Sequence, residues 1–270
     1  MYGILVDVTK CRGCEKCVTA CVLTNGLNPE AAASDRAITK DGLSANRLCT
    51  VLPADNGRFV RKSCMHCLEP SCVSACLVGG LRKTEQGAVI YDPDKCIGCR
   101  YCMLACPFHI PRYEWGKTAP LVKKCNMCLE RVKKEQLPAC VEACPYGVME
   151  FGERQGLIEK AHALIDNHPE TYLPHVWGEK EWGGTSVLFM SDVDLASVGW
   201  PWQPMESIPA LTEPLIKKTP VIGLTVGFGL WALSAIINRR NKVMAYERRS
   251  SQEQKPAKPG GDQEEECGER

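Results

Sequence analysis

Sixteen of the eighteen cysteines in this 270-residue chain stand in four groups of four, and no other feature restricts its possible folds so strongly. The groups are Cys11, Cys14, Cys17 and Cys21; Cys64, Cys67, Cys72 and Cys76; Cys96, Cys99, Cys102 and Cys106; and Cys125, Cys128, Cys140 and Cys144. The first and third groups have the C-x2-C-x2-C-x3-C spacing of bacterial ferredoxins, and the other two have an insertion before their third cysteine. Any fold of this chain must therefore gather these thiols.

The spacing suits a 4Fe-4S cubane, which has four iron corners that each take one thiolate. Three cysteines of a C-x2-C-x2-C loop bind one cubane, and the fourth cysteine reaches the other cluster of a pair. Two such motifs make two clusters, so four motifs predict four 4Fe-4S clusters. Zinc prefers two C-x2-C pairs for each ion, and disulfides require no such register, which makes both alternatives weak.

The expected strands decide which motifs pair. We expect strands at Gly3–Asp7, Ala88–Tyr91 and Val148–Phe151, and a helix over Gly156–Asn167 with Leu157, Ala161, Leu164 and Ile165 on one face. The strand at Ala88–Tyr91 links the second motif to the third, as in one ferredoxin. The other two strands enter the first motif and leave the fourth. The sequence thus predicts an α+β fold of two nested bacterial-ferredoxin-like units with short hairpins.

The crossed-ligand rule of paired clusters assigns the sixteen cysteines to four sets. We call these the first set (Cys11, Cys14, Cys17, Cys144), the second set (Cys21, Cys125, Cys128, Cys140), the third set (Cys64, Cys67, Cys72, Cys106) and the fourth set (Cys76, Cys96, Cys99, Cys102). No catalytic residues are predicted, because the sequence shows neither a nucleophile–base pair nor a Gly-rich nucleotide loop.

The expected organisation has four parts: a cluster domain at 1–155, a cysteine-free extension and membrane approach at 156–216, a transmembrane helix at 217–240, and a disordered charged tail at 241–270. The helix is expected because Thr219–Ile237 is an apolar run without charge, close to the roughly 20 residues that cross a bilayer core. The tail has too little apolar sequence to bury. The net charge of +1 gives no basic footprint for nucleic acid.

Four stretches resemble a known family. They are CMHCLEPSCVSAC at Cys64–Cys76, CIGCRYCMLACPFHIPRY at Cys96–Tyr113, PACVEACPYGVMEFG at Pro138–Gly152 and WGEKEWGGTSVLF at Trp177–Phe189. The chain resembles the four-cluster ferredoxin-like electron-transfer (beta) subunit of membrane-bound respiratory formate dehydrogenases and nickel–iron uptake hydrogenases, and also of molybdenum reductases. It departs from the family at Leu77, where a proline is usual.

The resemblance implies a relay between two partners. One is a large catalytic subunit, of the molybdenum or tungsten formate dehydrogenase type or the nickel–iron hydrogenase type. The other is an integral membrane subunit that binds quinone or haem. Two alternatives are an independent polyferredoxin that shuttles electrons, and the iron–sulfur subunit of a molybdenum reductase working in the opposite direction.

The flanking charges predict the orientation of the membrane helix. Lys217 and Lys218 precede the apolar run, whereas Arg239, Arg240, Lys242, Arg248 and Arg249 follow it. The more basic flank stays in the cytoplasm. We therefore expect a single-pass protein of the cell inner membrane, with its cluster domain on the periplasmic side and its C-terminus in the cytoplasm. No secretory signal is seen, so export is expected to depend on a partner that carries one.

Several residues outside the cysteine motifs have open interpretations. Cys49 is expected to be a buried thiol, and Cys267 an exposed one in the tail. His66 either tunes a cluster or is structural. Trp200 and Trp202 suit a membrane interface or a partner contact. The basic residues around the fourth motif form a solvated face or dock an acidic partner; they are Lys123, Lys124, Arg131, Lys133 and Lys134.

Overall fold

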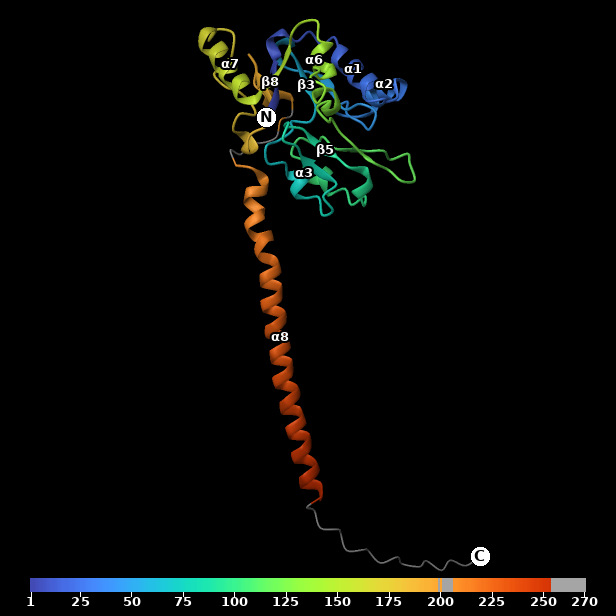
Figure 1. The fold of residues 1–270 in the computed structure, drawn as a ribbon, viewed down its shortest axis with the longest axis vertical. Coiled ribbons are helices and arrows are strands. Elements are labelled where there is room, and N and C mark those ends of the chain that lie inside the picture. The colour runs from blue at the N-terminus through green and yellow to red at the C-terminus, as the bar shows by residue number, and fades with distance from the viewer. Residues whose placement is uncertain (199, 201–205, 254–270) are drawn as a thin grey trace, which may run out of the picture. The chain divides into compact units, whose positions relative to one another are not determined.

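The computed structural model describes residues 1–198, 200 and 206–253 of the chain (Figure 1). They fall into two units, Met1–Thr212 and Glu213–Arg270. All sixteen motif cysteines lie in the first unit. Cys267 and Trp202 lie outside the described residues, so the expectations for them remain predictions.

A three-stranded sheet joins the two ends of the cysteine region. Strand β1 (Tyr2–Asp7) lies between β8 (Met149–Glu153) and β9 (Val187–Met190). It pairs antiparallel with β8, Ile4 opposite Phe151, and parallel with β9, Ile4 opposite Val187. The pairing of β1 with β8 confirms that the first and fourth motifs enclose the other two. Strand β9 was not predicted, because it is a short, wholly buried run in the cysteine-free part of the chain.

The sheet is buried on both faces, which explains the unbroken apolar run in β1. Ile4 and Val6 point into the main core, while Leu5 packs with Leu188 of β9 and Leu157 of helix α7 (Arg154–Asn167). The helix begins two residues before the expected start. Its buried side chains are Leu157, Ile158, Ala161 and Ile165, and Leu164 is partly buried. Helix α7 therefore covers one face of the sheet.

Three two-stranded hairpins complete the β-structure: β2 (Thr50–Pro53) with β3 (Phe59–Lys62), β4 (Leu81–Lys83) with β5 (Val89–Tyr91), and β6 (Arg112–Tyr113) with β7 (Val122–Lys123). The β4–β5 hairpin lies between the second and third motifs. This position confirms that these motifs form one unit, inserted within the other.

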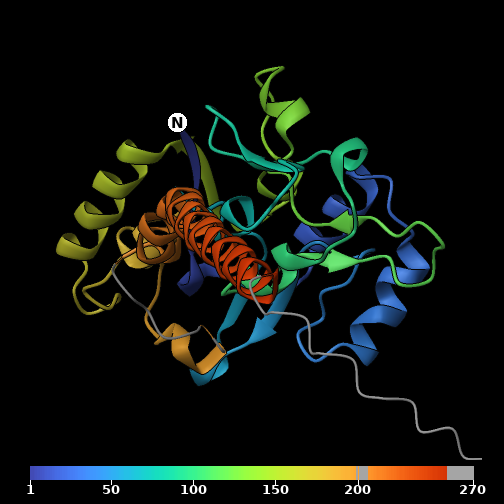
Figure 2. The same cartoon turned by 90° about the horizontal axis from the view of Figure 1, so that it is seen from below.

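Short helices carry the third cysteine of each motif. The α-helices of the cysteine region are α1 (Lys16–Thr24), α2 (Pro29–Ile38), α3 (Ser71–Ser74), α4 (Tyr101–Ala105), α5 (Leu129–Val132) and α6 (Ala139–Glu142). The 3-10 turns are η1 (Val8–Lys10), η2 (Asp55–Gly57), η3 (Pro93–Lys95), η4 (Glu181–Gly183) and η5 (Leu195–Val198). Both views show α2 and α7 on opposite sides of this unit (Figure 2).

The cysteine-free segment packs into the core of the cysteine region. Within residues 156–216, Trp177, Trp182 and Phe189 lie in the same core as Ile4 and several cysteines. Trp200 packs against this core too, at 5.3 Å between ring centroids from Phe189. The segment is rich in aromatic residues because it closes the core around the cysteine motifs.

Helix α8 (Ile208–Glu253) is longer at both ends than the predicted transmembrane helix. Within it, Lys218–Ser250 is long and apolar enough to cross a membrane. The most apolar part of this segment packs against nothing in the described structure. Residues 241–253 were expected in the disordered tail but are helical. They contain no glycine or proline, and a helix propagates through such sequence.

Candidate iron–sulfur sites

The first set is gathered from the two ends of the cysteine region. One cavity is lined by all four of its cysteines, together with Val148 and Arg61 among others. Burial raises the pKa of the Cys11 thiol, and the neighbouring thiols of Cys144 and Cys14 raise it further. Burial also raises the pKa of Cys17, to about 12. The β1–β8 pairing produces this site, because β1 leads into the first motif and β8 leaves the fourth.

The second set is gathered where α1 meets α6. The Cys21 thiol lies near Cys125, Cys125 lies near Cys140, and Cys140 lies near Cys128. Burial raises the pKa of Cys125 to about 12. Cys21 and Cys140 are buried, and no cysteine of this set is exposed.

The third and fourth sets form in the inserted unit. Burial raises the pKa of Cys67 well above its usual value, and Cys64, Cys106 and Cys72 raise it further. In the fourth set, burial and then the thiols of Cys76, Cys96 and Cys99 raise the pKa of Cys102 to about 11. The structure thus places together the cysteines that the crossed-ligand rule assigned to each set.

The four sets follow one another in a single order. Cys17 of the first set lies near Cys140 of the second. Cys125 of the second lies near Cys64 of the third, and Cys72 of the third lies near Cys102 of the fourth. Among the described cysteines, only Cys14 and Cys99 are exposed, and they belong to the first and the fourth set. The two outer sets therefore reach the surface through an exposed cysteine, whereas the two inner sets contain only buried and half-buried cysteines.

A left-handed residue recurs in every motif loop, one position before the second cysteine. These residues are Gly13, His66, Gly98 and Met127, with φ between 49° and 73°. The conformation turns the backbone N–H toward the first cysteine: the amides of Gly98 and Met127 donate to the sulfurs of Cys96 and Cys125, each at 3.4 Å. Hydrogen bonds to ligand sulfurs are one of the ways in which proteins set cluster potentials.

The buried side chain of His66, in the loop of the third set, also fits a bound cluster. His66 is buried between two cysteines of the third set, and its Nδ1 accepts a hydrogen bond from the Val89 amide at 2.9 Å. Burial lowers the pKa of the ring well below its usual value, so it is neutral and carries its proton on Nε2. That nitrogen has no partner among the described residues. A buried N–H donor of this kind indicates a missing acceptor, and a cluster sulfide is one.

The thiols of a set do not converge on a point. Among the residues that the structure describes, no three His, Cys, Asp or Glu side chains are close enough to hold a single metal ion. The seventeen cysteines of residues 1–198 are all free thiols. A cubane is wider than one ion, and each of its irons takes one thiolate.

Two buried cations beside the cysteines were not predicted. Arg61 of β3 and Lys124, which follows β7, are 3% and 7% exposed. Lys124 donates to two backbone carbonyls and is not available to dock an acidic partner. The neighbouring basic residues are also engaged, since Lys123, Arg131 and Lys133 form ion pairs with Glu114, Glu142 and Glu130. Nothing in a linear sequence distinguishes Lys124 from Lys123.

Cys49 is buried, as predicted, and lies beside the second set. Its thiol donates to the Cys17 carbonyl at 3.9 Å, and the neighbouring Cys21 thiol lowers the pKa of Cys49. It also packs with Val18 and Val51. The residue is thus part of the wall of this site rather than one of the four gathered thiols.

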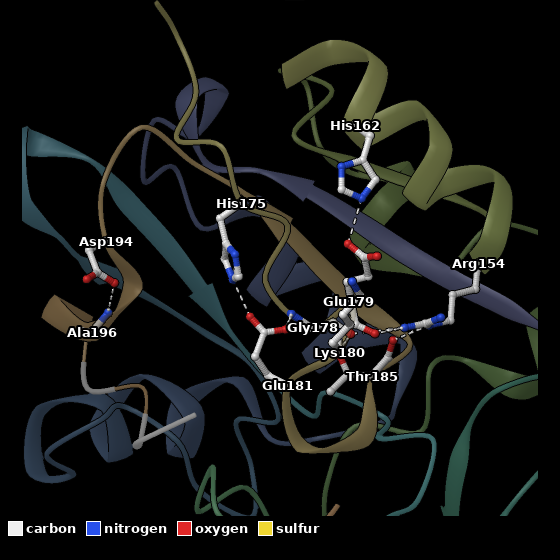
Figure 3. Close-up of polar contacts among 10 residues, drawn as sticks. All are labelled: Arg154, His162, His175, Gly178, Glu179, Lys180, Glu181, Thr185, Asp194 and Ala196. Carbon is white, nitrogen blue, oxygen red and sulfur yellow. Dashed lines mark hydrogen bonds and ion pairs between the residues drawn. The ribbon is translucent and has the colours of Figure 1, made fainter. Parts of the chain in front are cut away.

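A hydrogen-bonded loop at 177–186 holds the second motif in place (Figure 3). The buried carboxylate of Glu181 accepts from the Gly178 amide at 3.0 Å and contacts His175 Nε2 at 2.5 Å. Arg154 donates to the carbonyls of Thr185 and Glu179 at 2.7 and 2.8 Å. The Leu68 amide donates to the Gly184 carbonyl at 2.9 Å, and Thr185 forms an isolated antiparallel β-bridge with Cys67. These polar residues have a structural role.

Gly178→Ala should destabilise this loop. Gly178 has a φ of 88°, and an added Cβ would lie 2.3 Å from Thr185 Oγ1 and 2.7 Å from the Val187 carbonyl oxygen. The strain and the overlap together should lower the free energy of unfolding by about 2–4 kcal/mol. Thermal loss of cluster absorbance measures the effect. Gly116→Ala is the matched control, because its added Cβ meets nothing within 4 Å; equal melting of the two variants would contradict the prediction.

Comparison with known proteins identifies the family. The family described as 4Fe-4S dicluster domain matches residues 56–154, which include the last three cysteine motifs. The hydrogenase-2 operon protein HybA of Escherichia coli O157:H7 is 34% identical over 277 aligned residues, which cover 88% of this chain and 84% of HybA. The chain belongs to the 4Fe-4S dicluster family of iron–sulfur proteins.

Other members of this family are similar over much of the chain. A protein of Nitratidesulfovibrio vulgaris (strain Hildenborough) is 36% identical over 261 residues, covering 91% of this chain and 69% of the relative. The iron–sulfur subunit of the nitrate-inducible formate dehydrogenase of Escherichia coli K12 is 33% identical over 197 residues, covering 69% of this chain and 66% of the relative. The predicted ferredoxin-like α+β domain and its 4Fe-4S clusters are confirmed.

Proposed function

We propose that this chain is the electron-transfer subunit of a membrane-bound respiratory oxidoreductase, and that it binds four 4Fe-4S clusters. The observation that carries the proposal is the order of the four sets, with exposed cysteines only in the first and the last. Such an order gives electrons an entry and an exit at the surface and a protected path between them. A 4Fe-4S cluster supplies one-electron redox chemistry to this path.

The first to fourth sets would each hold one cluster, with the sixteen cysteines named above as ligands. The gathering of each set supports this assignment, as does the unpartnered N–H of His66. The cysteines supply thiolates, and the left-handed residues of the loops aim backbone amides at them. The aromatic side chains of Phe108, Trp182 and Phe189 share a core with Cys64, Cys106 and Cys140 of the inner sets.

The partners follow from the relatives and from helix α8. HybA belongs by name to a hydrogenase operon, and another relative is a formate dehydrogenase subunit. We therefore place a nickel–iron hydrogenase or formate dehydrogenase type of catalytic subunit at one end of the cluster chain. An integral membrane subunit that binds quinone or haem would be at the other, with the apolar segment of α8 as the chain's own membrane anchor.

Rapid freezing of the native complex during turnover tests the relay. The reduced clusters should give their EPR signals within one turnover of substrate addition, and the signals should disappear when quinone is added. Iron analysis of the purified, reconstituted full-length chain should give about sixteen irons per chain, because each of four sets holds a four-iron cluster. Quinone reduction while the clusters of this chain stay oxidised would refute the relay, and about eight irons would refute the count.

A further inference from the structure

Each of the two inner sets has a buried cation beside it, and one of these cations, Arg61, also lines the cavity of the first set. Arg61 and Lys124 are both almost fully buried. Within the described part of the chain, neither of them forms an ion pair with an aspartate or a glutamate. Burying an unpaired cation costs several kcal/mol, so these two side chains call for an anion that the protein's carboxylates do not supply.

Arg61 is adjacent to the second set. Its Nη2 donates to the sulfur of Cys140 at 3.5 Å, and its Nη1 donates to Ser63 Oγ at 2.6 Å. Its Nε has no partner among the described residues. Burial lowers the pKa of the guanidinium, but the thiols of Cys140, Cys49, Cys17 and Cys125 more than reverse this effect. The charge of Arg61 therefore lies beside the second set, on the side that faces the first.

Lys124 lies between the second and the third set: its neighbour Cys125 belongs to the second, and Val89, to which it donates, itself donates to His66 in the loop of the third. Its Nζ donates to the carbonyls of Val89 and Cys125, at 2.5 and 2.7 Å. Burial raises the pKa of the Cys72 thiol to about 12. The positive charge of Lys124 lowers the pKa values of Cys72 and Cys106. The positive charge of Lys124 therefore lies between the second and the third set.

Burial alone would make the inner clusters hard to reduce. A cluster with four thiolates is anionic, and an added electron increases a negative charge that a low-dielectric interior disfavours. The net charge around a cluster and its exposure to solvent both set its potential. Two covered clusters between two exposed ones would then oppose electron passage, unless fixed positive charges offset their burial.

We propose that Arg61 and Lys124 are fixed charges that raise the reduction potentials of the second and the third cluster, respectively. They are positioning residues for electron transfer, and they act through the field that they impose on the cysteine ligands. The inference rests on the proposed function, because it requires four clusters in this order.

The test is a redox titration, followed by EPR, of Arg61→Gln and Lys124→Gln in the intact complex. Each variant should lower the one-electron equilibrium constant of its own cluster by about tenfold or more, since a neighbouring charge changes comparable equilibria by one to three powers of ten. Tenfold corresponds to about 59 mV for one electron. Cys128→Ser and Cys67→Ser identify the signals of the second and third clusters.

The chain offers a matched control beside each cation. Lys62 and Lys123 carry the same charge one residue away, but they are partly exposed and pair with Asp41 and Glu114 at 3.2 and 3.8 Å. Lys62→Gln and Lys123→Gln should change the same constants by no more than about twofold, because exposed charges are screened. Equal shifts in a control and in its buried neighbour would overturn the proposal.

Charge-retaining variants decide the case if the glutamine variants lose a cluster. Arg61→Lys and Lys124→Arg should keep all four clusters, with equilibrium constants within about threefold of the parent, because the charge remains in place. Loss of the cluster in these variants too would show a structural role and overturn the proposal. Unchanged potentials with four clusters present would refute the fixed-charge role alone, whereas fewer than four clusters in the parent protein would refute the proposed function.

Discussion

Cys144→Ser should abolish the same EPR signal as Cys14→Ser, although the two residues lie at opposite ends of the cysteine region. Both belong to the first set, where the thiols of Cys144 and Cys14 lie beside that of Cys11. Loss of a cluster ligand should weaken iron binding at this set by at least about 100-fold, the upper end of what loss of an outer-sphere partner costs. EPR of the reduced protein, with iron analysis, measures the outcome.

Cys49→Ser is the matched control for this experiment. Cys49 is buried and lies beside Cys21, but it belongs to none of the four sets. All four signals should persist in this variant. If Cys144→Ser instead changes the signal that Cys99→Ser changes, the nested arrangement of ligands is wrong.

The nested fold was predictable because cysteine spacing carries long-range information. A C-x2-C-x2-C loop requires a fourth ligand from elsewhere in the chain, and few arrangements of four such loops satisfy that requirement. The expected strands at Gly3–Asp7 and Val148–Phe151 then had only each other as partners. Metal ligation thus specified a tertiary contact that hydrophobic periodicity alone would have left open.

The same spacing does not show what surrounds the ligands. Gly13 and Gly98 are residues that a left-handed loop position favours, but His66 and Met127 adopt the same conformation with no such signal. Likewise, Arg61 is buried in the middle of β3, whereas Lys62, the last residue of the strand, is half-buried. That difference depends on how the hairpin packs, and the residue types do not record it.

The extent of helix α8 was underestimated for a different reason. The apolar run at Thr219–Ile237 was recognised from its composition, whereas the helix continues to Glu253 through charged residues. Composition predicts where a segment is able to enter a membrane, but good helix formers such as Met, Ala, Glu and Arg extend the helix beyond that segment. The charged end of the helix is therefore continuous with the apolar part.

A tag placed after Arg270 should be protected from protease in spheroplasts, while the cluster domain should be digested. The charges that decide this follow the apolar run at Arg239, Arg240 and Lys242, and each lies within the reach of the positive-inside rule. These residues are exposed along α8. Permeabilising the membrane should make the tag accessible, which shows that protection came from the membrane rather than from folding.

Neutralising the basic residues that follow the apolar run tests whether they set the orientation of α8. Arg239, Arg240 and Lys242 replaced together by glutamine should produce a mixed orientation, with roughly half of the tags accessible, because the basic excess is then largely removed. Lys217 and Lys218 replaced by glutamine should strengthen the original orientation, since they are the opposing charges. A tag that is accessible in the parent protein, with a protected cluster domain, would place the clusters in the cytoplasm. The catalytic partner would then have to lie in the cytoplasm as well. An electron path through this chain requires the catalytic partner to be on the same side of the membrane as the cluster domain.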